Sequence, residues 1–283
     1  MRFRDLATGG VGEPEATPTA AATRSPASGR WTVTLVEAGA LLVLAVAYTL
    51  IRAAQGEDVA GALAHSRAIA EVEHWLIQHL ERPANSWLAS IPALAVPACY
   101  FYAVFHYAAT PLVLYRSWRI GGWVHRRGYW TLILASAIAL VIYARFPVAP
   151  PRLLPDLGMI DVMRAYADYG WWGDAASAPR GIGDATNQYA AMPSLHFGWS
   201  LWCAIQMWSF PGSWWRVAAV LYPSVQVLVV IATANHYLLD VLAGGLCVLV
   251  ALGVVVGLRW LRGRHSAEPV TATTAEVGGP KTR

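Results

Sequence analysis

Long apolar runs alternate with short polar segments along most of this chain. Six such runs lie near residues 32–51, 87–115, 129–146, 191–210, 217–234 and 237–258. An α-helix needs roughly 20 apolar residues to cross the hydrocarbon layer of a bilayer, and these runs are close to that length. The pattern therefore predicts an all-α, polytopic membrane protein with six transmembrane helices.

The segment between the first two runs, residues 53–85, has a different pattern. Ile69, Val72, Leu76 and Leu80 recur at helical spacing, and charged or polar residues stand between them. Such a helix has one apolar face but is too polar to span a membrane. We expect an interfacial amphipathic helix between the first and second transmembrane helices.

Both ends of the chain differ in composition from its middle. Residues 1–30 are rich in Ala, Thr, Pro and Gly and contain no apolar run, and residues 266–283 form a polar tail. Segments of this kind bury too little apolar surface to fold. The expected organisation is a disordered tail over 1–30, one six-span membrane domain over 31–265, and a second disordered tail over 266–283.

Composition supports a membrane protein and argues against nucleic-acid binding. The chain is 56% hydrophobic and 13% charged, whereas soluble proteins are about one quarter charged. Its net charge is +4, but the arginines lie in loops between apolar runs rather than along one basic face. We therefore expect no nucleic-acid partner. The oligomeric state stays open.

The arginines also predict how the chain is oriented. The 116–127 loop and the end of the last run are rich in arginine, whereas the 147–190 loop is net acidic. Cytoplasmic loops of membrane proteins carry the excess of positive charge. We therefore expect a multi-pass protein of the plasma membrane, bacterial by its composition, with both termini cytoplasmic.

Two histidines and an aspartate stand where apolar runs begin. His236 and Asp240 are four residues apart at the start of the last run, and His196 begins the run before it. On a helix, the four-residue spacing places both side chains on one face, where a carboxylate can orient an imidazole. A second histidine could then serve as acid and base. A metal site with these three ligands fits the same residue types.

Candidate anion-binding groups accompany them. Arg145 and Arg152 bracket the segment FPVAPP, and two guanidiniums on a stiff turn can bind a phosphate, a carboxylate or a lipid headgroup. Ser194 precedes the helix that carries His196, and the free N–H groups of a helix N-terminus bind anions. By the predicted topology, these residues lie at the outward face with both histidines. The arginines favour an anion over a metal.

These segments resemble the three motifs of the type 2 phosphatidic acid phosphatase (PAP2) superfamily, Lys-x6-Arg-Pro, Pro-Ser-Gly-His and Ser-Arg-x5-His-x3-Asp. Arg145 and Arg152 keep the spacing of the first motif, with arginine in place of lysine. Residues 192–196, MPSLH, keep the Pro, Ser and His of the second. His236 and Asp240 keep the spacing of the third.

The chain also departs from these motifs. Leu153 replaces the proline, Leu195 replaces the glycine, and Val230 stands where the family has a phosphate-binding arginine. The segments PPRL, AMPSLH and HYxxDVxxG resemble the branch that contains inositol phosphorylceramide synthases and related sphingolipid phosphotransferases.

The resemblance implies a phosphatase or phosphotransferase that uses no metal or other cofactor. His236, oriented by Asp240, would attack phosphorus and form a phosphohistidine, and His196 would protonate the leaving alcohol. His196 would then deprotonate water or an acceptor hydroxyl. Three residues would hold the phosphoryl oxygens: Arg145, Arg152 and Ser194.

The implied partners are membrane lipids, with a lipid phosphate as substrate and water or an alcohol as acceptor. The alternative is a non-enzymatic binder or transporter of lipid phosphates that uses the same residues only to bind. The pair of His236 and Asp240 favours the enzyme, because binding alone does not require an oriented imidazole.

Overall fold

The computed structural model describes residues 26–55, 58–172 and 188–265. The chain divides into two compact units, Met1–Gly39 and Ala40–Arg283. The second unit contains every candidate site residue. The tails expected over 1–30 and 266–283 lie outside the described residues, except that the first helix already begins at Pro26.

The described residues form helices joined by loops. In chain order the elements are α1 (Pro26–Gln55), α2 (Val59–Val72), α3 (His74–Leu76), the π-helical η1 (Ile77–Glu81), α4 (Arg82–Ala89), α5 (Pro92–Tyr100), the π-helical η2 (Phe101–Phe105), α6 (His106–Ile120), α7 (Gly122–Arg145), the 3₁₀ turns η3 (Pro151–Leu153) and η4 (Pro155–Leu157), α8 (Val162–Ala165), the 3₁₀ turn η5 (Ala167–Tyr169), α9 (Leu195–Met207), α10 (Ser213–Ala232) and α11 (Leu238–His265). An isolated parallel bridge joins Val148 and Ala190. The prediction of an all-α fold is confirmed.

Five helical stretches of the described chain are long and apolar enough to cross a membrane: Thr34–Ile51, Pro92–Ile120, Gly122–Arg145, Ser213–Ala232 and Leu238–Arg264. The run expected to span near 191–210 forms α9, which has only 13 residues. At about 1.5 Å per residue, that helix is shorter than the hydrocarbon layer. It is short because residues 191–194 form a loop before it and residues 208–212 form a turn after it. The polytopic helical fold is confirmed, and the count of six spans stays a prediction.

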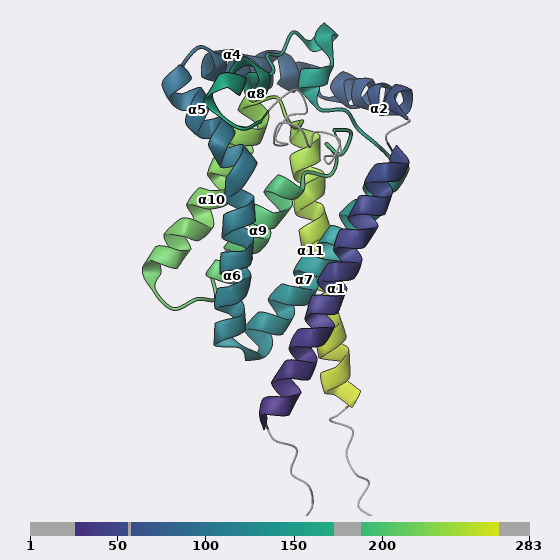
Figure 1. The fold of residues 1–283 in the computed structure, drawn as a ribbon, viewed down its shortest axis with the longest axis vertical. Coiled ribbons are helices and arrows are strands. Elements are labelled where there is room, and N and C mark those ends of the chain that lie inside the picture. Colours follow the sequence, from purple (N-terminus) through teal and green to yellow (C-terminus); the bar gives the residue numbers. More distant parts are fainter. Residues whose placement is uncertain (1–25, 56–57, 173–187, 266–283) are drawn as a thin grey trace, which may run out of the picture. The chain divides into compact units, whose positions relative to one another are not determined.

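Helix α9 packs against α6, α7, α10 and α11, and these helices run side by side in Figure 1. The contact with α11 is closest around Gly244, because a Cβ there would lie 2.1 Å from the carbonyl oxygen of Ser194. A Cβ on Gly198 would lie 3.1 Å from the carbonyl oxygen of Gly244. The missing side chains let the two backbones approach, as small residues do between membrane helices. This contact fixes the start of α9 against the first turns of α11.

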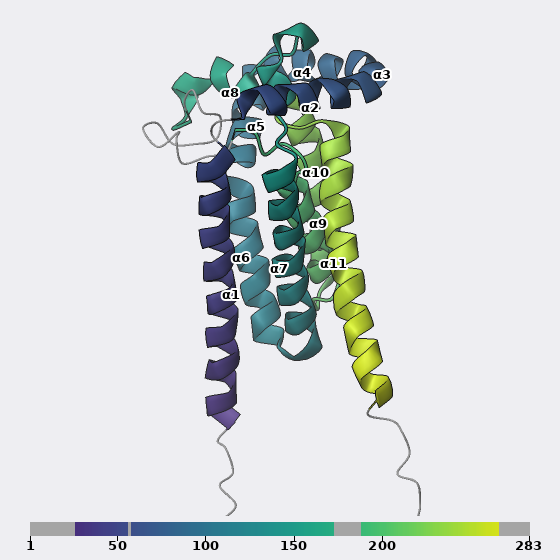
Figure 2. The same cartoon turned by 90° about the vertical axis from the view of Figure 1, so that its right-hand side faces the viewer.

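Helices α2 and α4 lie across the end of these helices at which α9 begins (Figure 2). Of the apolar residues that predicted an amphipathic helix here, Ile69 is buried, whereas Val72 and Leu80 are exposed. The buried face is partly polar and includes Ser66, Glu73, Glu81 and Asn85. The apolar residues that the sequence placed on this face therefore make up only part of it. The polar residues are buried there because they contact the elements beneath.

Polar side chains on this inward face bind backbone groups of the elements beneath it. The Ser66 hydroxyl donates to the carbonyl of Ala149 at 2.7 Å. The Asn85 amide donates to the carbonyls of Ile160 and Ala232 at 2.9 Å each, and its Oδ1 accepts from the Ile160 N–H. Since loop backbone would otherwise be buried without partners, these side chains stabilise the loops around the site.

Candidate active site

His236 lies in the turn between α10 and α11 and is 4% exposed. Its Nδ1 is 2.8 Å from the carbonyl oxygen of Ala191 and 3.4 Å from Oδ2 of Asp240. Both neighbours can only accept when Asp240 is ionised, so Nδ1 carries the proton and donates to them. In the neutral ring, Nε2 then holds the lone pair. That atom is buried and has no hydrogen-bond partner among the described residues.

The backbone that presents His236 is a tight turn at the end of α10. The N–H of Ala234 donates to the carbonyl of Ile231 at 2.9 Å, and the N–H of Asn235 donates to the carbonyl of Val230 at 3.1 Å. These two bonds form a Schellman motif, whose left-handed position is usually glycine. Here Ala234 occupies it with a φ of 55°. The turn therefore holds a strained residue two positions before His236.

Arg152 stabilises this turn through hydrogen bonds. Its side chain is 3% exposed, and its Nε donates to Oδ1 of Asn235 at 2.9 Å. Its Nη1 donates to Oδ2 of Asp161 at 3.3 Å, and its backbone N–H donates to the carbonyl of Ala234 at 3.0 Å. The amide of Asn235 donates in turn to Thr233 Oγ1 at 2.8 Å. A guanidinium has five N–H donors, so Arg152 keeps donors beyond these two side-chain bonds.

His196 lies in the first turn of α9, with its ring centroid 5.5 Å from that of His236. The ring stacks on Tyr102 at 4.2 Å and meets the ring of His106 edge-on at 4.3 Å. Although the residue is partly exposed, its Nε2 is covered and has no hydrogen-bond partner among the described residues. Two imidazoles with unpaired Nε2 atoms therefore lie next to each other.

Ser194 connects His196 to α11. Its Oγ accepts from the N–H of Phe197 at 3.4 Å as the cap of α9, and its backbone N–H donates to the carbonyl of Asp240 at 2.9 Å. The residue is fully buried. The Ser194 hydroxyl accepts at the cap and still has a hydrogen to donate.

Arg145 and Val230 are placed differently from the other sequence candidates. Arg145 is the last residue of α7 and is exposed, and the described residues give it no hydrogen bond or ion pair. Val230 of α10 is fully buried in an apolar cluster that also contains Val229 and, from α11, Val241. The position of the family's arginine is therefore filled by core packing, and Arg152 is the arginine that contacts the turn of His236.

The structure adds residues that the sequence analysis did not identify. Tyr102 and His106 surround His196, Asn235 receives Arg152, and Tyr237 bonds to the Ser66 hydroxyl at 2.7 Å. Burial raises the pKa of the Tyr237 phenol above its ordinary value, so this group is a neutral partner. The four-residue spacing of Tyr102 and His106 is a signal that could have placed both on one face of a helix.

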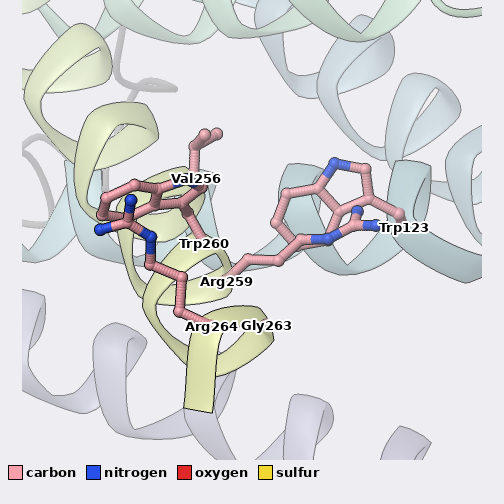
Figure 3. A pocket seen from close by; sticks show the side chains of 6 residues that line it. All are labelled: Trp123, Val256, Arg259, Trp260, Gly263 and Arg264. Carbon is pink, nitrogen blue, oxygen red and sulfur yellow. The ribbon is translucent and has the colours of Figure 1, made fainter. Parts of the chain in front are cut away.

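Other features lie away from these histidines. The described residues contain no group of three or more His, Cys, Asp or Glu side chains placed to hold a metal ion. A hollow of about 540 Å³ lies beside the last turns of α11, lined by Trp123, Val256, Arg259, Trp260, Gly263 and Arg264 (Figure 3). In it, the Arg259 guanidinium lies 4.2 Å from the Trp123 ring centroid. This hollow is at the opposite end of α11 from Asp240.

Comparison with known proteins identifies one family. A family model described as the PAP2 superfamily matches residues 67–254. The match includes all the candidate site residues given above. No curated protein and no solved structure shows significant similarity to the chain.

Proposed function

Because the chain belongs to the PAP2 superfamily, whose members are typically phosphatases or phosphotransferases, we propose that it transfers the phosphoryl group of a lipid phosphate through His236. The observation that carries this proposal is the state of His236, whose Nδ1 is committed to Ala191 and Asp240 while Nε2 is unpaired. An imidazole held in this tautomer is a nucleophile with a supporting third group. A binding site alone has no need of that arrangement.

In the first step, the lone pair of His236 Nε2 attacks phosphorus, so the N–P bond forms as the bond from phosphorus to the lipid oxygen breaks. Burial lowers the pKa of His196 in the free protein, and the bound phosphate anion favours the imidazolium again. The departing oxygen takes its proton from this imidazolium. Asp240 balances the positive charge that develops on the His236 ring. The products of this step are the lipid alcohol and a phosphohistidine.

In the second step, the oxygen of water or of an acceptor alcohol attacks phosphorus while the N–P bond breaks. The now neutral His196 takes the proton of the attacking hydroxyl, and His236 returns to its starting state. Inorganic phosphate is the product with water, and a new phosphate ester is the product with an alcohol. Hydrolysis and transfer therefore use the same protein groups.

The developing charge on the phosphoryl oxygens needs fixed donors. Arg152 supplies N–H groups from a buried, braced position next to the His236 turn. Ser194 and the first amides of α9 lie beside His196. Arg145, exposed at the end of α7, would complete this set by moving onto the phosphate. Donors held in place before the reaction stabilise the transition state without reorganising.

The substrate would reach the site from the membrane, and we place the site at the outer face of a bacterial plasma membrane. The support is the distribution of arginines: Arg127 contacts Gln206 near the end of α9, and Arg259 contacts Trp123 at the far end of α11. Both lie at the opposite end of these helices from His196 and Asp240. By the positive-inside rule that opposite end is cytoplasmic, and we propose the cytoplasmic side for both chain termini as well. The PPRL, AMPSLH and HYxxDVxxG segments support a relationship to the inositolphosphotransferase branch.

The test uses the full-length protein in detergent with a panel of lipid phosphates and with EDTA present. Release of inorganic phosphate, or its transfer to added inositol or glycerol, should be lost in His236→Ala. A matched control is His65→Ala, because His65 is a histidine outside the site that stacks on Phe146. Turnover that survives His236→Ala would reject His236 as the nucleophile. Lipid-phosphate binding without turnover would identify a binder or transporter.

A further inference from the structure

Two buried carboxyl groups lie over the beginning of α11. Glu73 follows α2 and Glu81 ends η1, and each residue is 2% exposed. In Figure 2, α2 and α3 lie above α11. Both glutamates lie in the segment 53–85 for which the sequence predicts an amphipathic helix, and the structure turns both inward.

Each carboxyl group accepts from the backbone of α11. Oε1 of Glu81 accepts from the N–H of Leu238 at 3.0 Å, and Oε1 of Glu73 accepts from the N–H of Leu239. Oδ2 of Asp240 accepts from the N–H of Tyr237 at 2.9 Å. Three successive amides at the start of the helix are therefore satisfied by three different carboxyl groups. Free amides of a first turn need such partners, and acids are favourable there.

This arrangement concentrates more negative charge than a buried site can hold. The Oε2 atoms of Glu73 and Glu81 are buried and have no ordinary donor among the described residues. Asp240 is fully buried close by and is needed as an anion beside His236. When carboxylates share a buried site, one of them keeps a proton, and the protonated oxygen donates to its neighbour.

We propose that Glu73 and Glu81 form a carboxyl pair that shares one proton and positions the His236–Asp240 turn through the Leu238 and Leu239 amides. The proposal rests on the function proposed above for His236. It makes both glutamates positioning residues, because they contact the helix that carries Asp240 and not the phosphoryl group.

The protonation equilibria agree with this geometry. Burial, and then the charge of Glu73, raise the pKa of Glu81 to about 8. Burial also raises the pKa of Glu73, which is lowered in part by its bond to Leu239. The ionisable groups that face the pair are Asp240, whose charge raises both pKa values, and the phenol of Tyr237. Glu81 is therefore the member that keeps the proton at neutral pH.

Because of the carboxyl pair, the free energy of unfolding should fall as the pH rises. The pKa of Glu81 is about 8 in the folded protein, compared with 4.5 for a free glutamate side chain. A raised pKa means that its contribution to stability is complete below pH 4.5 and is lost progressively as the pH rises from 4.5 through 8. Above that pH, two carboxylates and Asp240 repel one another at the start of α11. The turn that presents His236 loosens as a result.

The experiment measures the melting temperature of the full-length protein in detergent from pH 5 to pH 9. Wild type should lose several degrees as the pH rises from 5 through 8, and the loss should level off above pH 8. Glu81→Gln keeps an acceptor for Leu238 and a donor for Glu73 but cannot ionise, so its profile should be flat over that range. The matched control is Glu71→Gln, an exposed glutamate near the end of α2, which should follow wild type. Equal pH slopes in wild type and Glu81→Gln would overturn the proposal.

A second measurement covers the case in which Glu81→Gln does not fold. Wild type labelled with ¹³C-glutamate should show the infrared band of a protonated carboxylic acid at neutral pH, and that band should vanish as pH rises through 8. Absence of the band at neutral pH would also overturn the pair.

Measurements of turnover distinguish a failure of the carboxyl-pair proposal from a failure of the proposed function. Glu81→Leu should lower kcat at least tenfold, with Glu81→Gln close to wild type at neutral pH and less inhibited above pH 8. No turnover in wild type, with the expected melting profile, would reject the function and leave the carboxyl pair. Turnover that requires His236, with the same pH slope in Glu81→Gln, would reject the pair alone.

Discussion

The Nδ1 atom of His236 is 2.8 Å from the carbonyl oxygen of Ala191, a residue 45 positions earlier in the chain. This hydrogen bond fixes the imidazole tautomer even without Asp240, which lies farther away at 3.4 Å. It also links the segment before α9 to the turn before α11. The orientation of the candidate nucleophile thus depends on a backbone contact as much as on the carboxylate that the sequence motif suggested.

The two histidines should respond differently to the leaving group. His196→Ala removes the acid, so it should lower kcat about 10²- to 10⁴-fold with an alkyl phosphate. The loss should shrink with a p-nitrophenyl phosphate, whose leaving group needs no proton. His236→Ala should be inactive with both substrates, because no N–P bond forms. Steady-state rates on the two substrates check this, and equal losses for His196→Ala would contradict its role as the acid.

Gly244→Ala should separate α9 from α11. Its new Cβ would lie 2.1 Å from the carbonyl oxygen of Ser194, and overpacking of this kind costs about 1–3 kcal/mol. The matched control is Gly253→Ala in the same helix, where a Cβ has nothing within 4 Å. We expect Gly244→Ala to lower both the melting temperature and turnover, and Gly253→Ala to change neither. Normal activity in Gly244→Ala would show that this contact does not set the site.

Arg152→Lys should be more harmful than Arg145→Lys. Arg152 uses Nε for Asn235 and Nη1 for Asp161, and a lysine ammonium cannot reproduce that planar geometry. Loss of a fixed donor to the phosphoryl oxygens lowers kcat about 10²-fold. Arg145 is exposed, so a lysine there should keep most of the rate. The reverse order in measured kcat values would show that Arg145 is the principal phosphate donor.

Ala234→Gly should stabilise the protein modestly. The left-handed conformation costs a residue with a Cβ about 1–2 kcal/mol, and glycine regains part of that while losing more entropy on folding. Ala234→Val should be destabilising, since a branched side chain tolerates a φ of 55° poorly. Thermal unfolding in detergent measures both variants. A lower melting temperature for Ala234→Gly would mean that packing of the buried methyl group outweighs the strain.

Cysteine labelling should establish the orientation. Cys99, Cys203 and Cys247 are buried, so an added exposed cysteine can be labelled above a low background. A membrane-impermeant maleimide on spheroplasts should label Tyr169→Cys, near the site end, and should leave Arg126→Cys unlabelled. Both positions are exposed. Labelling of Arg126→Cys alone would place the histidines on the cytoplasmic side.

Local features of the sequence are enough to predict the membrane class and much of the candidate site. Apolar length is a local property, so the helices α7, α10 and α11 follow from composition alone. The four-residue spacing likewise brings His236 within 3.4 Å of Asp240 because a turn and the first residues of one helix suffice to do so. The position of Ser194 as a helix cap is local in the same way.

Packing of the whole fold brings together groups from segments that are distant in the sequence. Ala191 accepts from His236, Tyr102 stacks on His196, and Asn235 accepts from Arg152, although no local pattern pairs these residues. The inward orientation of Glu73 and Glu81 belongs to the same class. A carboxylate on a helix is normally a solvated group, and only the amides of α11 packed against it make the buried position stable. The periodicity of a helix indicates which of its faces is apolar. Which polar side chains are buried on that face depends on hydrogen-bond partners in other parts of the fold.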